Sequence, residues 1–414
     1  MPGALGRTFD SLLPVGRLSR AERVAVASMW LVGVLQGFAQ SQAAATLPFA
    51  RVGLGIDEGE MSAILAVARI ASFGALALSH WGDRRGRKVP FLAAYTLVIA
   101  AGFGSSLVQA PWQFAIGQSL VRVGTAALTT LVVVLLAEQV DRSLRAFAIS
   151  IYGAAGSLGA ALALATLPLA GAGPEAWRIP FALSGVGVVA LPLLVRTVRE
   201  SPRSPGFVPS SAPLRELLTG PFARRFWLVA AIGMVGSAFT AVSLSFSTER
   251  LIDDVGLTVG AAVAVSLLGG TVGGLGFFVG GRLADVFGRR PVAVAALLMA
   301  AAGGVGLYWF TAIVPLVASI VVGSFGSFSF VPAAAAHRAE LFPTETRATA
   351  GTAAANLAMV GSAAGLGLGR FTIAAFGLSE TVTFLAGGMV VAAMLTLLLP
   401  ETKGQALDGV RPDR

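Results

Sequence analysis

Twelve stretches of mostly apolar residues, each about long enough to cross a membrane as a helix, run through this chain of 414 residues. A spanning helix needs about 20 apolar residues. Charged residues make up only 12% of the chain, against roughly 25% in soluble domains, which excludes an ordinary soluble enzyme. The sequence therefore predicts an all-α membrane protein with twelve transmembrane helices. The predicted spans are 24–49, 61–81, 90–108, 112–137, 146–169, 177–195, 226–248, 258–280, 291–310, 314–336, 348–371 and 378–399.

The longest polar stretch divides these helices into six and six. It covers residues 196–225 and contains five Pro and six Arg. We therefore expect an N-terminal six-helix bundle with its N-tail at 1–195, a central loop at 196–225, a C-terminal bundle at 226–400 and a tail at 401–414.

Basic residues are distributed unevenly between the two predicted sides of the membrane. With twelve spans, both tails and the central loop fall on one side, and that side holds 24 of the 30 Lys and Arg residues. Four more lie on the opposite side and two lie inside helices. Lys and Arg are enriched in cytoplasmic loops. We therefore expect a multi-pass protein of the plasma (inner) membrane with both termini in the cytoplasm, and we explain the net charge of +9 by topology rather than by nucleic-acid binding.

The loops after the predicted second and eighth helices repeat each other at a spacing of 202 residues. Asp83, Gly86, Arg87 and Lys88 match Asp285, Gly288, Arg289 and Arg290, and the same spacing relates Glu138 to Glu340 and Arg145 to Arg347. A spaced duplicate of charged and Gly residues is not required by membrane topology. It indicates a duplicated six-helix unit. Halves with the same orientation are related by an axis along the membrane normal, and a solute site lies between them near the midplane.

The repeated residues have the chemistry of a gate at the cytoplasmic end. Gly permits positive φ in a tight turn, and an Asp near a helix N-terminus is stabilised by exposed N–H groups. Arg145 and Arg347 open helices, where a carboxylate partner is expected. The predicted gate consists of Asp83, Arg84, Gly86, Arg87, Lys88, Glu138, Arg145, Asp285, Gly288, Arg289, Arg290, Glu340 and Arg347.

The loop pattern Gly-x-x-x-Asp-x-x-Gly-Arg-Arg at 281–290 resembles the signature of the major facilitator superfamily. The first copy has Ser79 where Gly is usual, and Val286 in the second copy replaces a frequent Arg. The resemblance covers nearly the whole chain. It implies that the gate residues form a salt-bridge lock, which in that family holds the outward-open state and breaks in the inward-open state.

Other segments resemble particular branches of that superfamily. The segments at 199–203 and 400–404, and the run Glu340–Arg347, resemble those of sugar and organic-ion porters, although the glutamine-rich sugar signatures are absent. The Gln36-Gly37-Phe38-Ala39-Gln40 run is similar to the Asp-Gly-Phe-Asp of aromatic-acid/proton symporters, with Gln in place of both acids. The Gly-Pro core typical of drug antiporters is absent from the predicted fifth helix.

Two Arg residues fall near the middle of predicted helices, where no Asp or Glu lies. Charges at this depth face a cavity or a partner. Arg122 and Arg69 could contact an anionic group on a solute, but Arg122 could instead couple conformations and Arg69 could bind backbone carbonyls. Neutral polar groups nearby could contact solute or join helices. The candidate solute-binding residues are Gln36, Gln40, Arg69, Gln118, Arg122, Ser237, Thr240 and Asn356.

These patterns predict a monomeric secondary transporter that moves a small organic solute, with an organic anion as one candidate, by rocker-switch alternating access. No catalytic residue, cofactor or metal is expected, because the chain has no Cys, and its two His residues, His80 and His337, are expected to be solvated at the cytoplasmic surface. Coupling to a proton stays open. The alternatives are a multidrug or metabolite efflux antiporter and a receptor that binds solute without transporting it.

Overall fold

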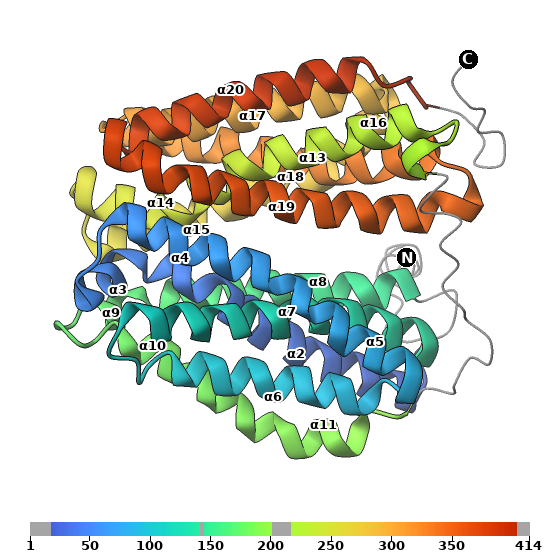
Figure 1. Ribbon diagram of the computed structural model, residues 1–414, viewed down its shortest axis with the longest axis horizontal. Helices are drawn as coiled ribbons and strands as arrows, with labels where there is room; N and C mark the ends of the chain where they lie inside the picture. The colour runs from blue at the N-terminus through green and yellow to red at the C-terminus, as the bar shows by residue number, and fades with distance from the viewer. Residues whose placement is uncertain (1–17, 141–144, 201–216, 404–414) are drawn as a thin grey trace, which may run out of the picture. The chain divides into compact units, whose positions relative to one another are not determined.

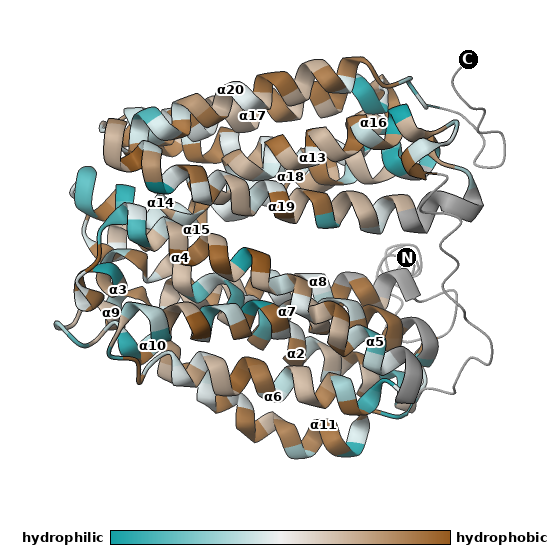
Figure 2. Ribbon diagram, viewed as in Figure 1, coloured by the Kyte–Doolittle hydropathy of each residue, from teal (hydrophilic) through white to brown (hydrophobic). Residues whose placement is uncertain are grey.

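The computed structural model describes residues 18–140, 145–200 and 217–403, and every regular element in these ranges is helical (Figure 1). Apolar residues cover most of the helical surface, and hydrophilic residues gather towards the helix ends (Figure 2). This pattern is typical of helices that lie in lipid, where backbone polar groups must be satisfied within the helix.

Eleven helical stretches are long and apolar enough to cross a membrane by length and composition. The predicted third span corresponds to Lys88–Gly104, which is apolar but has 17 residues in the described structure. This helix stops before its predicted end at 108 because Ser105 and Ser106 turn the chain, with each hydroxyl bonded to a nearby carbonyl. The eleven stretches are Arg20–Ala45, Glu58–Gly82, Pro111–Leu136, Ile151–Ala170, Arg178–Thr197, Ala223–Asp254, Val259–Phe287, Arg289–Trp309, Ile313–Arg338, Ala350–Phe376 and Leu378–Leu397.

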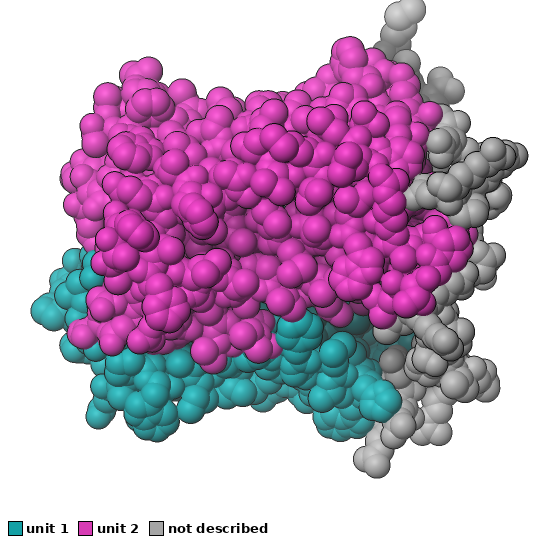
Figure 3. Space-filling model, turned by 45° about the horizontal axis from the view of Figure 1, so that its top comes forward, with its two compact units in different colours: residues 1–54, 71–206 teal, residues 55–70, 207–414 magenta. Residues whose placement is uncertain are grey.

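The chain divides into two compact units (Figure 3). Unit 1 comprises residues 1–54 and 71–206, and unit 2 comprises 55–70 and 207–414. The helix that begins the second predicted span, Glu58–Ala71, therefore groups almost wholly with unit 2. Unit 1 contains α2 (Arg20–Ala45), α3 (Leu47–Leu54), η2 (Ser72–Gly74), α5 (Ala75–Arg85), α6 (Lys88–Gly104), α7 (Pro111–Gln139), α8 (Arg145–Ala165), α9 (Leu167–Ala170), α10 (Arg178–Leu183), η3 (Ser184–Ala190) and α11 (Leu191–Thr197). Unit 2 contains α4 (Glu58–Ala71), α13 (Ala223–Ser245), α14 (Ser247–Glu249), η4 (Arg250–Asp254), α15 (Val259–Gly274), α16 (Gly276–Phe287), α17 (Arg289–Trp309), α18 (Ile313–Leu341), α19 (Thr344–Phe376) and α20 (Leu378–Leu397).

The sequence repeat reappears in the way helices pack within each unit. A Cβ added at Gly159 of α8 would lie 2.0 Å from the Val34 carbonyl oxygen of α2. At the position 202 residues later, a Cβ at Gly361 of α19 would lie 2.1 Å from the Met234 carbonyl oxygen of α13. Small residues let the backbones of membrane helices approach this closely. The α2–α8 and α13–α19 pairs therefore both depend on a glycine at their contact.

Two Arg residues on the predicted outer side cap the C-terminal ends of equivalent helices. Arg178 donates to the carbonyl oxygens of Ser106 and Val108 just after α6, and it also pairs with Glu175. In unit 2, Arg250 donates to the carbonyl oxygens of Leu307 and Phe310 at the end of α17 and lies 3.2 Å from Asp254. The last carbonyls of a helix lack intrahelical partners and carry partial negative charge. Capping therefore gives these two outer Arg residues a structural role.

Candidate functional site: the helix junctions and the polar interior

In unit 2, the turn between α16 and α17 is built around Gly288. Its φ of +111° and ψ of 156° lie in a region of backbone conformation that is essentially restricted to glycine. The next residue, Arg289, pairs with Asp285 across the turn. Arg289 also contacts Glu340 at the end of α18, with Nη2 3.0 Å from Oε1 and Nε 3.2 Å from Oε2. The structure thus brings together three predicted gate residues from three helices.

The segment after α20 completes this cluster. The Thr402 hydroxyl donates to Glu340 Oε2 at 2.6 Å. The Glu401 carboxylate accepts the backbone N–H groups of Arg289 at 2.9 Å and Arg290 at 3.0 Å, which lie at the N-terminus of α17. Arg290 in turn donates to the Leu399 carbonyl oxygen at 3.2 Å. A carboxylate at a helix N-terminus satisfies free N–H groups and is favoured by the helix dipole.

These contacts change the acidity of Glu401. Burial raises the pKa of its carboxyl group, but hydrogen bonds from the backbone N–H groups of Arg289, Arg290, Lys403 and Thr402 lower it, and the net effect holds the pKa below its ordinary value. Charge-assisted bonds of this kind favour the ionised form. Glu401 is therefore anionic wherever an ordinary carboxyl group is.

Unit 1 has an equivalent junction between α5 and α6. Gly86 has a φ of +104° and ends α5 as Gly288 ends α16. Glu200, which follows the last helix of unit 1, accepts the backbone N–H groups of Arg87 at 2.7 Å and Lys88 at 3.2 Å with Oε1. The side chains of Asp83, Arg84, Glu138, Arg145 and Arg347, which belong to the predicted gate, lie outside the described residues.

The sequence prediction did not assign Glu200, Glu401 or Thr402 to the gate. Each glutamate follows the last helix of its half, and the two are 201 residues apart, one residue less than the repeat. This spacing, close to that of the repeat, was the signal in the sequence that could have indicated the two glutamates. A carboxylate on a flexible segment reveals its partner only once the backbone is folded, so sequence spacing alone did not identify the bond.

Among the predicted solute contacts in unit 1, Gln36 lies in a buried network of neutral groups. It is 8% exposed, and its Nε2 donates to the Thr129 hydroxyl of α7 at 2.6 Å. The Tyr152 hydroxyl of α8 donates to Gln36 Oε1. Both ends of the amide are thus engaged, and Tyr152 was not among the predicted residues because its helical position gave no polar pattern.

The remaining predicted residues of unit 1 differ in their surroundings. Arg122 is half-buried, and its Nη2 donates to the carbonyl oxygen of Gln40 at 3.3 Å; the Gln40 side chain itself is exposed. Gln118 is 4% exposed and donates to the Ser105 hydroxyl at 3.1 Å, which joins α7 to the end of α6. Gln118 therefore has a helix-joining contact, whereas Arg122 and Gln40 lie together.

In unit 2, Thr240 donates to backbone carbonyl oxygens of its own helix, those of Gly236 at 3.1 Å and Ser237 at 3.4 Å. Ser237 on α13 and Asn356 on α19 are half-buried. Arg69, on α4, is also half-buried and groups with unit 2, whereas Arg122 belongs to unit 1. The structure therefore does not bring the two Arg residues together within one unit.

One histidine differs from its sequence expectation. His80 is exposed, but His337 is 3% exposed instead of solvated, and its Nε2 lies 2.9 Å from the Pro400 carbonyl oxygen. The segment after α20 covers the end of α18 and takes the imidazole out of solvent. The prediction that His337 is solvated used only its distance from the helix end, so it could not account for the segment after α20 that packs over it.

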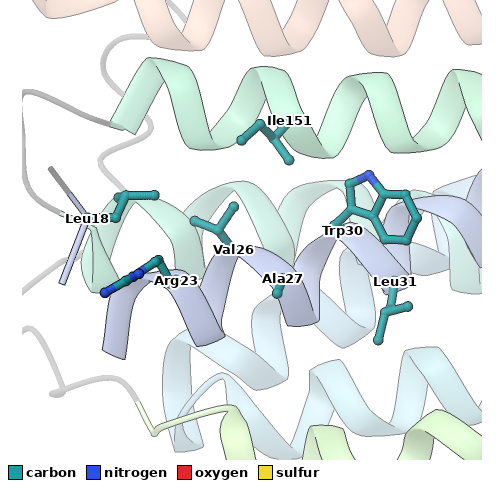
Figure 4. Close-up of a pocket in the computed structure, with 7 residues that line it drawn as sticks. All are labelled: Leu18, Arg23, Val26, Ala27, Trp30, Leu31 and Ile151. Atoms are coloured by element: carbon teal, nitrogen blue, oxygen red, sulfur yellow. The ribbon is translucent and has the colours of Figure 1, made fainter. Parts of the chain in front are cut away.

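A cavity of about 380 Å³ lies along the first turns of α2, with Ile151 of α8 opposite (Figure 4). Its lining is almost entirely apolar, and Arg23 is the one charged residue among the seven that line it. None of the predicted solute-binding residues lines this cavity. Its position beside a partly exposed Trp30 is typical of a surface that faces lipid.

The helical spans are those of a multi-pass membrane protein. The family model of the Major Facilitator Superfamily matches residues 29–285 and 253–412, and the chain belongs to this family. A search of curated protein sequences finds no significant match.

Solved structures of transporters share the fold. A bacterial homologue of the human lysosomal transporter Spinster, in an inward-facing and occupied conformation, is similar with a TM-score of 0.77 and 16% identity over 92% of this chain and 97% of the other. The nucleoside transporter NupG, in a mutant form, is similar with a TM-score of 0.73 and 15% identity, over 90% of this chain and 99% of the other. The inward-open xylose transporter XylE from E. coli is similar with a TM-score of 0.72 and 20% identity, over 92% of this chain and 97% of the other. At these identities the likeness shows the fold alone.

Proposed function

We propose that this protein is a secondary transporter that moves a small organic solute across the plasma (inner) membrane by alternating access. Twelve helices form two six-helix bundles with both termini in the cytoplasm, and Lys88–Gly104, the third in chain order, completes the twelve. It has 17 residues, so at 1.5 Å per residue it reaches about 26 Å, close to the roughly 30 Å core.

The duplicated junction carries this proposal. In each unit, a glycine turn precedes the third helix, and a glutamate from beyond the last helix binds that helix's first N–H groups. We infer that these two matched junctions rearrange together as the bundles rock, which is the movement that alternating access requires.

The solute class follows from the charges inside the helices. Arg122 lies well inside α7, where the sequence places no Asp or Glu, and its guanidinium donates to the Gln40 carbonyl oxygen. We infer that an anionic group of the solute binds Arg122, with Gln40 and the Gln36 network supplying neutral contacts. Arg69, Gln118, Ser237, Thr240 and Asn356 are the further candidates for the site.

Flux measurements test both parts of this proposal. Purified protein in liposomes should take up at least one labelled metabolite from a panel of organic anions, cations and sugars. Arg122→Gln should abolish anion uptake, and Arg122→Lys should weaken it by about tenfold, because Lys keeps the charge but lacks the planar fork. Arg224→Gln, at an exposed position of α13, serves as the matched control and should transport normally. Binding without flux would support a receptor, and transport restricted to cations would refute the anion site.

A further inference from the structure

A second cavity lies entirely within unit 2, at the end of α18 that leads to the gate cluster. It has a volume of about 150 Å³ and is lined by residues of α13, α17, α18 and α20 and by Leu399. Most of its lining is apolar and includes Val229 and Ile232 from α13 and Val331 and Ala334 from α18. An apolar cavity of this volume holds one benzene-sized ring. The cavity is therefore suited to a small apolar body rather than to a drug-sized ligand.

One end of this cavity is cationic. Arg338 lines it one turn after Ala334 and is half-buried. Within the described ranges, no carboxylate, carbonyl or hydroxyl oxygen binds the Arg338 guanidinium. A second guanidinium, that of Arg225, donates to the carbonyl oxygen of Leu341 at the same end of α18. A buried cation without a partner is costly, so a ligand that supplies an anion would be stabilised here.

Glu340 and Glu401, the two glutamates of the gate cluster, are held by other groups. Glu340 is bound by Arg289 and by the Thr402 hydroxyl. Glu401 is bound by the backbone N–H groups of Arg289 and Arg290. Both carboxylates are therefore committed to the gate cluster, and neither is bound to Arg338.

His337 connects the cavity to that cluster. It lines the cavity, is 3% exposed, and its Nε2 lies 2.9 Å from the Pro400 carbonyl oxygen. Because a carbonyl oxygen only accepts, Nε2 carries the proton and donates it. Pro400 precedes Glu401 and Thr402, so one wall of the cavity touches the segment that holds the gate residues.

We propose that this cavity binds a small carboxylate with a single-ring or branched apolar body, such as benzoate. The carboxylate pairs with Arg338, and the ring lies along Ala334, Val331, Val229 and Ile232. This site goes beyond the proposed transport site, since it lies in unit 2 at the end of α18, whereas Arg122 lies in unit 1. Through His337 and Pro400, an occupied cavity stabilises the segment that carries Glu401 and Thr402.

A single Cys reports on occupancy, because the chain has none of its own. Ala334→Cys places a thiol in the cavity, and Ala335→Cys, the next residue of α18, places one at an exposed position as the matched control. In lipid-stripped protein in detergent, benzoate should slow maleimide labelling of Ala334→Cys several-fold and leave Ala335→Cys unchanged. Benzyl alcohol, which has the ring but no charge, should protect far less.

Substitution of Arg338 tests the charge. Equilibrium dialysis of labelled benzoate against the otherwise unaltered protein should show a loss of affinity of about tenfold or more for Arg338→Gln, as expected for a charge-assisted hydrogen bond, with part recovered in Arg338→Lys. Equal protection by benzyl alcohol, unchanged binding in Arg338→Gln, or no benzoate binding that depends on Arg338 would each overturn the proposal.

Two further arms separate this site from other sources of the signal. Benzoate protection of Ala334→Cys should persist in Arg122→Gln, even though that variant should lose anion transport; loss of protection there would mean that the proposed transport site is being reported instead. In nanodiscs, neutral phosphatidylcholine should leave Ala334→Cys reactive. Protection by anionic phosphatidylglycerol, with no added effect of benzoate, would assign the cavity to a lipid and refute the carboxylate site.

Discussion

A single buried amide shows how side chains inside α2 are fixed. Gln36 donates to Thr129 and accepts from Tyr152, so the nitrogen and oxygen of its amide are each assigned to one neighbour. Burial makes both bonds necessary, because an unsatisfied buried polar group costs about 1–3 kcal/mol. Gln36 is therefore held in one orientation by two neighbouring helices.

Thr129→Val or Tyr152→Phe should each destabilise the protein by about 1–3 kcal/mol, since either change leaves one end of the Gln36 amide without its partner. The thermal unfolding midpoint of purified protein measures this. Thr130→Val is the matched control, because Thr130 is exposed as Thr129 is, but its hydroxyl bonds the Ala126 carbonyl oxygen of its own helix, at 3.4 Å, and not Gln36. Equal effects at Thr129 and Thr130 would contradict the network.

Glu401 gives the junction a defined pH dependence. Its pKa is lowered in the folded protein, so its contribution to stability is present above the unfolded pKa, near the ordinary value of 4.5, and is lost as the pH falls through the lower folded pKa. Wild type should therefore be more stable than Glu401→Gln at neutral pH, and the difference should shrink only in acid below that ordinary value. Unfolding midpoints of both proteins, measured from neutral pH downward, check this. A difference that grows in acid would show the opposite sign.

At the scale of elements, the two halves share more than their charged loops. The second predicted span bends at η2, which ends at Gly74, and the eighth bends between α15 and α16, where Gly276 begins α16; these glycines are 202 residues apart. α7 ends at Gln139 and α18 at Leu341, again 202 residues apart. The duplicated sequence thus encodes repeated bends and helix ends as well as repeated gate residues.

Gly288→Ala should destabilise the α16–α17 junction by about 1–3 kcal/mol, because its backbone conformation is strained for any residue with a Cβ. The new Cβ would also lie 2.8 Å from Glu401 Oε2 and would displace that carboxylate from α17. The unfolding midpoint, and the reactivity of a Cys at Lys403, should report the loss. Gly270→Ala in α15, where a Cβ meets nothing within 4 Å, is the control and should be neutral or stabilising.

For the whole molecule, charge distribution predicts its orientation in the membrane. The central stretch at 196–225 should lie in the cytoplasm, because basic loops are retained on that side. A Cys at Ser210 should therefore resist an impermeant thiol reagent in intact cells, while a Cys at Ala172, in the exposed turn after α9, should react. Labelling of the Ser210 variant from outside would reverse the proposed topology.

The gate should control the balance between conformations of the whole transporter. Glu340→Gln leaves Arg289 with one carboxylate fewer, and Asp285→Asn removes the other, so the double variant should shift a two-state equilibrium by about 1–3 kcal/mol towards the inward-open state. Distances between spin labels at the ends of the helices follow this shift. The exposed pair substitution Arg20→Gln with Arg23→Gln is the control. Unchanged distance distributions in the gate variant would remove the lock from the mechanism.

The sequence by itself determined the class of protein and the position of the junctions. Apolar length defines membrane helices, and the repeat located the glycine turns and Arg289 beside Glu340, because these depend on local geometry and on residues near helix ends. The folded structure alone decided that Glu401 and Thr402 join that cluster, that Tyr152 fixes Gln36, and that His337 is buried. It also showed that the third predicted span ends at Gly104 instead of at residue 108. Each of these depends on segments far apart in the chain or on turn hydrogen bonds, and hydropathy carries no information about which buried polar groups meet.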